Sequence, residues 1–152
     1  MIRRIYIDTS VVGGYFDKEF SEVTILFFER VLRDKTVLIV SELLRAELIK
    51  APEQVKKMLS SLPKSQIELV ELTEEATLLA DKYIEENVVG KTSRADCQHI
   101  AMATLSKVDV LVSWNFKHIV NLERIRGYNS INMREGYPIL EIRSPKEIFS
   151  YE

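Results

Sequence analysis

Short apolar runs alternate with longer amphipathic segments along this chain. Runs of apolar residues bounded by turn formers predict strands at 5–7, 36–40, 67–70, 109–113 and 138–142. Segments with apolar positions three or four residues apart predict helices at 22–34, from Ser41 onward, and at 52–62, 73–87, 94–107 and 115–131. Ser41, Thr73 and Ser93 stand where N-caps are expected.

Strands that alternate with helices predict the α/β fold class, with a parallel sheet covered by helices on both faces. In such sheets, ligands bind at the carboxyl ends of the strands. Asp8 and Asn115 each follow a predicted strand, while Glu47 and Asp96 fall in the early turns of predicted helices. The pattern therefore favours one shared site at that edge of the sheet.

Composition narrows the class of protein. A chain of 152 residues with 46% hydrophobic and 29% charged positions is typical of one globular domain, which we expect to span 1–152. The only cysteine, Cys97, cannot form an internal disulfide, which fits a reducing compartment. Neither a membrane-spanning run nor a signal-peptide core is present, so we expect a cytoplasmic protein that does not bind membranes.

The net charge of −2 does not by itself favour a nucleic-acid partner, because such proteins are often basic. It does not exclude one either. Carboxylates that hold metal ions make a sequence acidic, and the bound metal makes the site less negative.

Each candidate carboxylate also has an ordinary structural interpretation. Asp8 can be a turn or cap residue, Glu47 a partner for Arg45 or Lys50, and Asp96 a first-turn carboxylate favoured by the helix dipole. As metal ligands they would instead act together. Their order along the chain, each near the expected carboxyl edge of the sheet, favours that second interpretation.

Three other polar residues lie near these carboxylates in sequence. His99 shares a helix face with Asp96, but hard divalent ions prefer oxygen ligands, so packing or hydrogen bonding is its favoured role. Asn115 suits the cap of a following helix and can also hydrogen-bond a metal-bound water. Trp114 and Phe116 beside it are most simply explained by packing in the core or at its rim.

Four motifs together resemble the PIN-domain family, and more narrowly the VapC-type toxins of prokaryotic toxin–antitoxin pairs. The third and fourth are the most specific, and the resemblance covers nearly the whole chain. In order, the motifs lie at 5–10, 41–47, 95–101 and 111–119.

This resemblance implies a three-layer α/β/α sandwich around a mostly parallel sheet of about five strands. It implies a metal-dependent endoribonuclease that uses Mg²⁺ or Mn²⁺, with Asp8, Glu47 and Asp96 as the metal-site carboxylates. Thr9 or Ser10 would supply a hydroxyl to ligand water or substrate.

The fourth motif departs from the family pattern, because Asn115 stands where many members carry aspartate. An amide oxygen is neutral, which weakens the case for a second tightly held metal. Asp109 begins the same predicted strand at its opposite end and is a poor replacement.

The expected mechanism requires an activated water and neutralisation of phosphoryl charge, both of which a bound cation supplies. We expect Asp8 and Asp96 to hold the main ion and Glu47 to orient or deprotonate the water. Clustered carboxylates without metal should include one with a raised pKa. Contacts to the RNA backbone are predicted for Lys91, Arg94 and Lys117.

A toxin of this class implies an antitoxin partner. The apolar stripe in 22–31 or the helix 52–62 could line the groove for it, or form a homodimer. Two alternatives remain. One is a catalytically weak PIN module that binds RNA or a protein. The other is a nucleotide-binding or signalling α/β domain, against which no glycine fingerprint or P-loop is present.

Overall fold

A computed structural model describes residues 2–90 and 93–148. Its centre is a five-stranded sheet in the order β3-β2-β1-β4-β5, and every neighbouring pair is parallel. The α/β class and the parallel sheet are therefore confirmed. The strands are β1 (Arg4–Ile7), β2 (Val37–Ser41), β3 (Ile67–Val70), β4 (Val110–Val112) and β5 (Ile142–Arg143).

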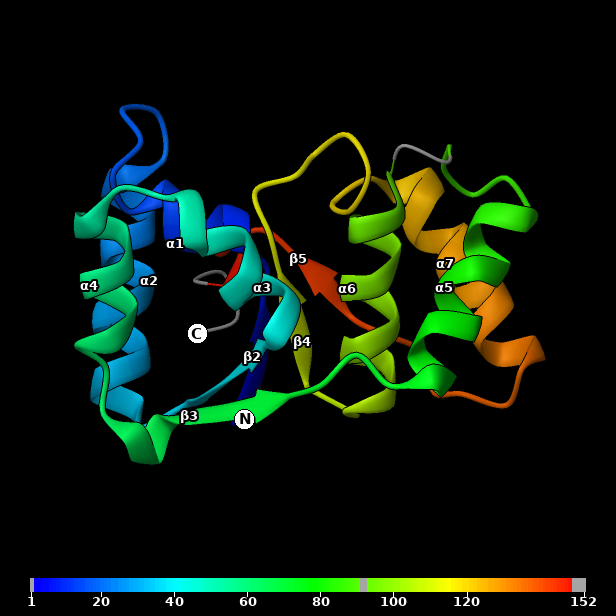
Figure 1. Cartoon of the computed structure of the whole chain (residues 1–152), viewed down its shortest axis with the longest axis horizontal. Coiled ribbons are helices and arrows are strands. Elements are labelled where there is room, and N and C mark those ends of the chain that lie inside the picture. Colours follow the sequence, from blue (N-terminus) through cyan, green and yellow to red (C-terminus); the bar gives the residue numbers. More distant parts are fainter. Residues whose placement is uncertain (1, 91–92, 149–152) are drawn as a thin grey trace.

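Helices cover both faces of the sheet, with α2 and α4 on one side and α5, α6 and α7 on the other (Figure 1). This is the three-layer sandwich that the resemblance implied. The α-helices are α1 (Thr9–Gly14), α2 (Ser21–Asp34), α3 (Glu42–Glu47), α4 (Glu53–Ser60), α5 (Glu74–Glu85), α6 (Arg94–Leu105), α7 (Leu122–Arg134) and α8 (Pro145–Ile148), and the 3₁₀ turns are η1 (Leu48–Lys50) and η2 (Lys64–Gln66).

The two faces of the sheet build two separate cores, because neighbouring strand residues point to opposite faces. Ile5 and Ile7 pack into the core beneath α2 and α4. Tyr6 between them packs into the core beneath α5, α6 and α7. Strands buried on both faces explain why the apolar runs are continuous rather than alternating. In the described part of the chain, no helix has both the length and the apolar character to cross a membrane.

Two of the three expected helix caps are confirmed. The Ser41 hydroxyl accepts a hydrogen bond from the backbone N of Leu44 at 3.0 Å, and the Thr73 hydroxyl accepts one from Ala76 N at 3.1 Å. The prediction for Ser93 is wrong in detail. Ser93 precedes α6, but its side chain makes no capping hydrogen bond.

The predicted helix at 115–131 is wrong at its start, because α7 begins only at Leu122. Asn115 instead caps a tight turn, where its Oδ1 accepts hydrogen bonds from the backbone N of Lys117 and His118. Asn121 caps α7 by accepting a hydrogen bond from Arg124 N. The chain thus makes a separate loop between β4 and α7.

The strand expected at 138–142 is also misplaced, since β5 covers only Ile142–Arg143. The side chain of Asn129 on α7 accepts a hydrogen bond from Leu140 N at 2.8 Å and donates one to Leu140 O at 3.0 Å. These bonds satisfy backbone groups that a strand would have used for pairing, so sheet pairing begins later.

Candidate active site

Asp8 lies at the carboxyl end of the central strand, between the carboxyl ends of β2 and β4. The chain adds β2 and β3 on one side of β1 and then β4 and β5 on the other, which makes this point a topological switch where α/β proteins bind ligands. The parallel register pairs Ile7 with Val112, so the next residue along each strand, Asp8 and Ser113, are neighbours.

The Asp8 carboxylate is 4% exposed and makes no helix-capping hydrogen bond, although Asp8 occupies the N-cap position of α1. Its Oδ1 accepts a hydrogen bond from Ser10 Oγ at 2.6 Å, and its Oδ2 accepts one from Ser113 Oγ at 2.7 Å. Each hydroxyl in turn accepts a backbone N–H, Ser10 from Trp114 and Ser113 from Asn115, both at 2.9 Å. These hydroxyls are therefore oriented to donate toward Asp8.

Asp96 approaches from the first turn of α6 and is half-buried. Asn115 Nδ2 donates a hydrogen bond to its Oδ1 at 3.2 Å. The other end of the same amide is oriented by the two backbone N–H groups that Asn115 Oδ1 accepts. Asn115 therefore presents its N–H₂ group, and not its oxygen, to the candidate metal ligand.

Glu47 is the sixth and last residue of α3, so it lies in an early helical turn as predicted, in a helix that is short. Its side chain is 36% exposed, and its Oε1 accepts hydrogen bonds from Thr9 Oγ1 at 2.7 Å and from His99 Nε2 at 2.9 Å. His99 Nδ1 lies 2.6 Å from the hydroxyl of Tyr6. Because an ionised carboxylate can only accept, Nε2 donates to Glu47, and in a ring that carries only this proton Nδ1 accepts from the Tyr6 hydroxyl.

The three carboxylates differ in electrostatic environment. Burial raises the pKa of Asp8, against the opposing effects of the His99 ring and the two serine hydroxyls. Burial also raises the pKa of Asp96, where His118 opposes the shift and the nearby charge of Asp8 adds to it. The pKa of Glu47 is lowered, chiefly by its hydrogen bond from His99. The first two carboxylates therefore resist ionisation without a cation, as expected for clustered acids.

Asp96 is near enough to Asp8 for the charge of Asp8 to raise the Asp96 pKa, whereas Glu47 is held by Thr9 and His99. Within 2–90 and 93–148, no three His, Cys, Asp or Glu side chains are grouped closely enough to hold a metal ion. Three carboxylates on one ion therefore remain a prediction. Two carboxylate donors do fit Mg²⁺, which is typically held by one or two carboxylates, waters and substrate phosphates.

Two of the candidate RNA contacts lie in the described part of the chain. Arg94 is exposed and pairs with Asp81, and Lys117 is exposed in the turn after β4. Lys91 lies outside the described residues. Sequence reasoning missed Tyr6 and Ser113 as supporting residues. The signal for Ser113 was its place directly after a strand that pairs with β1.

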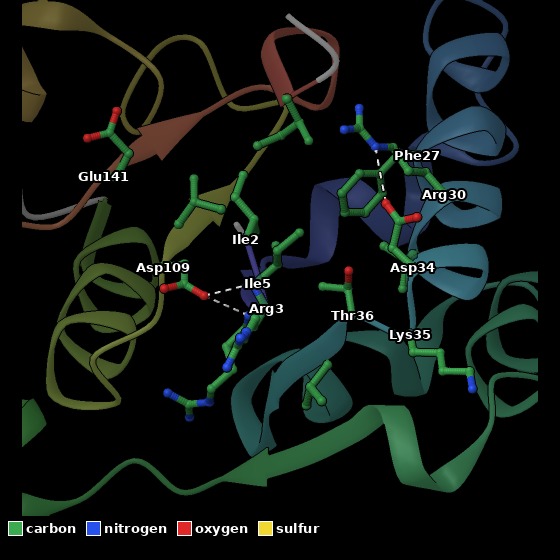
Figure 2. Close-up of a pocket in the computed structure, with 15 residues that line it drawn as sticks. Ile2, Arg3, Ile5, Phe27, Arg30, Asp34, Lys35, Thr36, Asp109 and Glu141 are labelled. Atoms are coloured by element: carbon green, nitrogen blue, oxygen red, sulfur yellow. Dashed lines mark hydrogen bonds and ion pairs between the residues drawn. The ribbon is translucent and has the colours of Figure 1, made fainter. Parts of the chain in front are cut away.

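A cavity of about 1230 Å³ lies at the opposite, amino end of the sheet (Figure 2). There Asp109 Oδ2 accepts hydrogen bonds from the backbone N of Arg3 at 2.8 Å and of Arg4 at 2.9 Å. Arg30 on the far wall pairs with Asp34 at 3.5 Å. Asp109 therefore anchors the start of β1. It cannot serve in place of the aspartate that many PIN-domain proteins carry where this chain has Asn115.

No protein-family model and no curated protein matches the sequence. Solved structures do match over most of the chain. VapBC2 from Rickettsia felis, bound to a promoter DNA fragment, is 16% identical with a TM-score of 0.58 and covers 93% of this chain and 98% of its own. DNA-bound VapBC from Salmonella typhimurium is 17% identical with a TM-score of 0.58, covering 95% and 99%.

A third match is VapC20 from Mycobacterium tuberculosis, described as a toxin that cleaves the sarcin–ricin loop. It is 11% identical with a TM-score of 0.55, and the match covers 74% of this chain and 91% of that one. At sequence identities this low, the matches show only that the folds are similar. The chain therefore has the PIN-type fold of the VapC-like proteins.

Proposed function

We propose that this protein is a divalent-metal-dependent endoribonuclease, the toxin of a toxin–antitoxin pair. The observation that carries the proposal is the buried Asp8 carboxylate at the topological switch point, with Asp96 close enough for the charge of Asp8 to raise its pKa. A pair of carboxylates that resist ionisation at a ligand-binding edge is expected where a cation normally neutralises them. The VapC-like fold adds support by analogy.

In this proposal Asp8 and Asp96 hold Mg²⁺ or Mn²⁺. The bound cation would acidify a water molecule and neutralise charge that develops on the phosphoryl group. Ser10 and Ser113 keep Asp8 in place through hydrogen bonds to both of its oxygens. Asn115 orients Asp96 through its amide nitrogen.

Glu47 is the proposed base that orients or deprotonates the attacking water. Its lowered pKa keeps it ionised, which favours orienting the water by accepting a hydrogen bond over removing its proton. Thr9 and His99 both donate to Oε1, and this leaves Oε2 as the oxygen that would face the water. Tyr6 fixes the His99 tautomer, and this pair therefore positions the base without touching substrate.

RNA phosphates are proposed to meet Arg94 and Lys117, which flank the site and are exposed. Lys91 remains a prediction for the same role. An antitoxin partner is also proposed, by analogy with the VapBC complexes. The homodimer and the cytoplasmic location remain predictions from the sequence. The helix predicted at 52–62 corresponds to α4, which borders an apolar groove of about 730 Å³ beside β3.

The second candidate is a VapC-like module that binds RNA or a protein without cutting. One observation favours it: Asn115 uses its only side-chain oxygen within its own turn. The fourth motif therefore supplies no side-chain oxygen from Asn115 to a second metal.

The test is cleavage of a mixed RNA pool with Mn²⁺, with Mg²⁺ and with chelator. Wild type is compared with Asp8→Asn and with the matched control Asp34→Asn, an exposed aspartate at the end of α2. Metal-dependent cutting that only Asp8→Asn abolishes is the expected result. If the folded wild type binds metal but cuts nothing, the nuclease proposal fails and the binding module replaces it.

A further inference from the structure

Three aromatic side chains form a cluster beside the candidate active site. Trp114 stacks on Phe20, with ring centroids 4.2 Å apart and planes 19° from parallel. Phe116 leans on both rings, with its centroid 6.0 Å from Trp114 and 6.4 Å from Phe20. Trp114 is 8% exposed and Phe116 is 49% exposed. The cluster therefore has a buried base and one open outer ring.

The buried base is held from several directions. Trp114 Nε1 donates a hydrogen bond to Thr24 Oγ1 at 2.9 Å, and its backbone N donates one to Ser10 Oγ. Gly14 lies directly against the indole, because a Cβ added there would be 2.8 Å from two of its ring atoms. Phe116 therefore rests on a fixed support, so a ligand that binds its ring orders little of the protein.

The same cluster is joined to both candidate metal ligands. Ser10, which accepts the Trp114 N–H, donates its own proton to Asp8. Asn115, between the two aromatic residues in sequence, donates to Asp96. The loop that carries the aromatic cluster therefore also holds both carboxylates, and an RNA phosphate bound at them would lie beside this loop.

Phe116 offers no polar side-chain atom, so its ring cannot bind a phosphate or read the edge of a base. An exposed aromatic ring can stack with an unpaired base, which every single-stranded nucleotide supplies. The exposed lysine that follows, Lys117, is suited to the adjoining phosphate. A protein interface normally needs about 800 Å² on each partner, whereas a phenylalanine side chain presents about 200 Å² in total.

We propose that Phe116 is a base-stacking subsite for an unpaired nucleobase next to the cut phosphate. The inference rests on the proposed ribonuclease function and adds to it a residue that would hold one base of the substrate. In a duplex the bases already stack on one another, so they cannot offer a face to the Phe116 ring.

Binding is measured first, in the Asp8→Asn background with chelator, so that no cutting occurs. Fluorescence anisotropy compares a labelled single-stranded RNA with a duplex of the same sequence. Phe116→Ala and Phe116→Leu are expected to weaken single-strand binding about tenfold, whereas Phe116→Tyr keeps it. Duplex binding should not change, and the control Met133→Ala, an exposed apolar residue on α7, should bind both RNAs normally.

If Phe116→Leu in the Asp8→Asn background binds single-stranded RNA as tightly as Asp8→Asn alone, stacking does not contribute and the subsite is overturned. The exposed ring would then serve another apolar contact, such as one to a protein partner. Absence of any single-strand binding would overturn the subsite as well. A parallel cleavage assay separates the two proposals. If wild type cuts and Phe116→Leu cuts with the same KM, the nuclease stands and the subsite fails. If binding depends on stacking but wild type does not cut, the subsite stands and the nuclease fails.

Discussion

Asp8 is held in a setting that opposes its own ionisation. It is almost fully buried, and the two serine hydroxyls that reach it only partly offset the loss of water. A charge buried in this way lowers stability unless a cation pairs with it. The burial of Asp8 therefore lowers the stability of the metal-free protein and favours binding of a cation. Such a trade-off between stability and function is common at functional sites.

Replacing Asp8 by Asn should abolish cleavage, with a loss of at least the roughly 100-fold that outer-shell changes can cause at metal sites. It should also change how stability depends on pH. A carboxyl with a raised pKa loses stabilising free energy as pH rises from about 3.9, its unfolded value, through its folded pKa. Asn does not titrate.

Urea unfolding in chelator, from pH 4 to pH 8, tests this second effect. The unfolding free energy of Asp8→Asn minus that of wild type should increase with pH across this range. Asp34→Asn is the control and should show no such rise. A constant difference for Asp8→Asn would mean that Asp8 is not destabilised by its burial.

Tyr6 supports the proposed base through His99, and the effect is measurable. Tyr6→Phe removes the hydroxyl 2.6 Å from His99 Nδ1, leaving the tautomer and orientation of the ring unfixed. We expect kcat to fall about 10- to 100-fold, with a stability loss of about 1–2 kcal/mol. Tyr137→Phe is the matched control, since that phenol donates to the exposed Glu75. An unchanged kcat in Tyr6→Phe would remove the pair from the mechanism.

At the scale of elements, the loop after β4 is bound to the start of α1 by side chain and backbone together. Ser113 reaches Asp8, Trp114 reaches Ser10, and the indole of Trp114 packs against Gly14. These contacts therefore join two sides of the candidate site that are separated by most of the chain.

Two neighbouring glycines of α1 allow a matched test of this packing. Gly14→Ala places a Cβ 2.8 Å from the buried indole, and overpacking of this kind costs about 1–3 kcal/mol. A Cβ at Gly13 meets nothing within 4 Å, so Gly13→Ala should stabilise the helix by up to about 1 kcal/mol.

Urea unfolding gives both values, and Trp114, the only tryptophan, reports the local change through its emission. Gly14→Ala should shift this emission and lower cleavage, while Gly13→Ala should do neither. Equal stability of the two variants would contradict the close packing of α1 against Trp114.

At the scale of the whole molecule, two apolar cores and a parallel sheet hold the fold without help from the site. Both faces of β1 are buried, and the candidate metal ligands lie at the edge of the sheet. Metal should therefore stabilise the protein by binding to a site that is already folded, as mass action requires.

Thermal unfolding with MnCl₂ and with chelator tests this expectation. In chelator the protein should still unfold in one cooperative transition. Mn²⁺ at about 100 times its Kd should add about 2.7 kcal/mol to wild type, or roughly 5–10 °C in a chain of this size. Asp8→Asn should show little of this shift. A shift of equal size in both proteins would place the bound metal elsewhere.

Local patterns in the sequence predicted most of the helices and strands and their order, because periodicity and turn residues act within a few positions. The continuous apolar runs identified β1 to β4, and the caps Ser41 and Thr73 located two helix starts. The strand-end position of Asp8 followed directly. Local patterns failed at 115–121 and 138–141, where side chains of Asn115 and of Asn129 on α7 take backbone hydrogen bonds that regular structure would have used.

The contacts between polar side chains could be known only from the tertiary structure. Ser113 reaches Asp8 across 105 positions because β1 and β4 pair in one register. Glu47 turns to Thr9 and His99 rather than joining the two aspartates, and Asn115 presents its nitrogen to Asp96. Such contacts depend on strand order, register and side-chain orientation. Packing between distant segments sets all three, and a local sequence pattern carries no information about that packing.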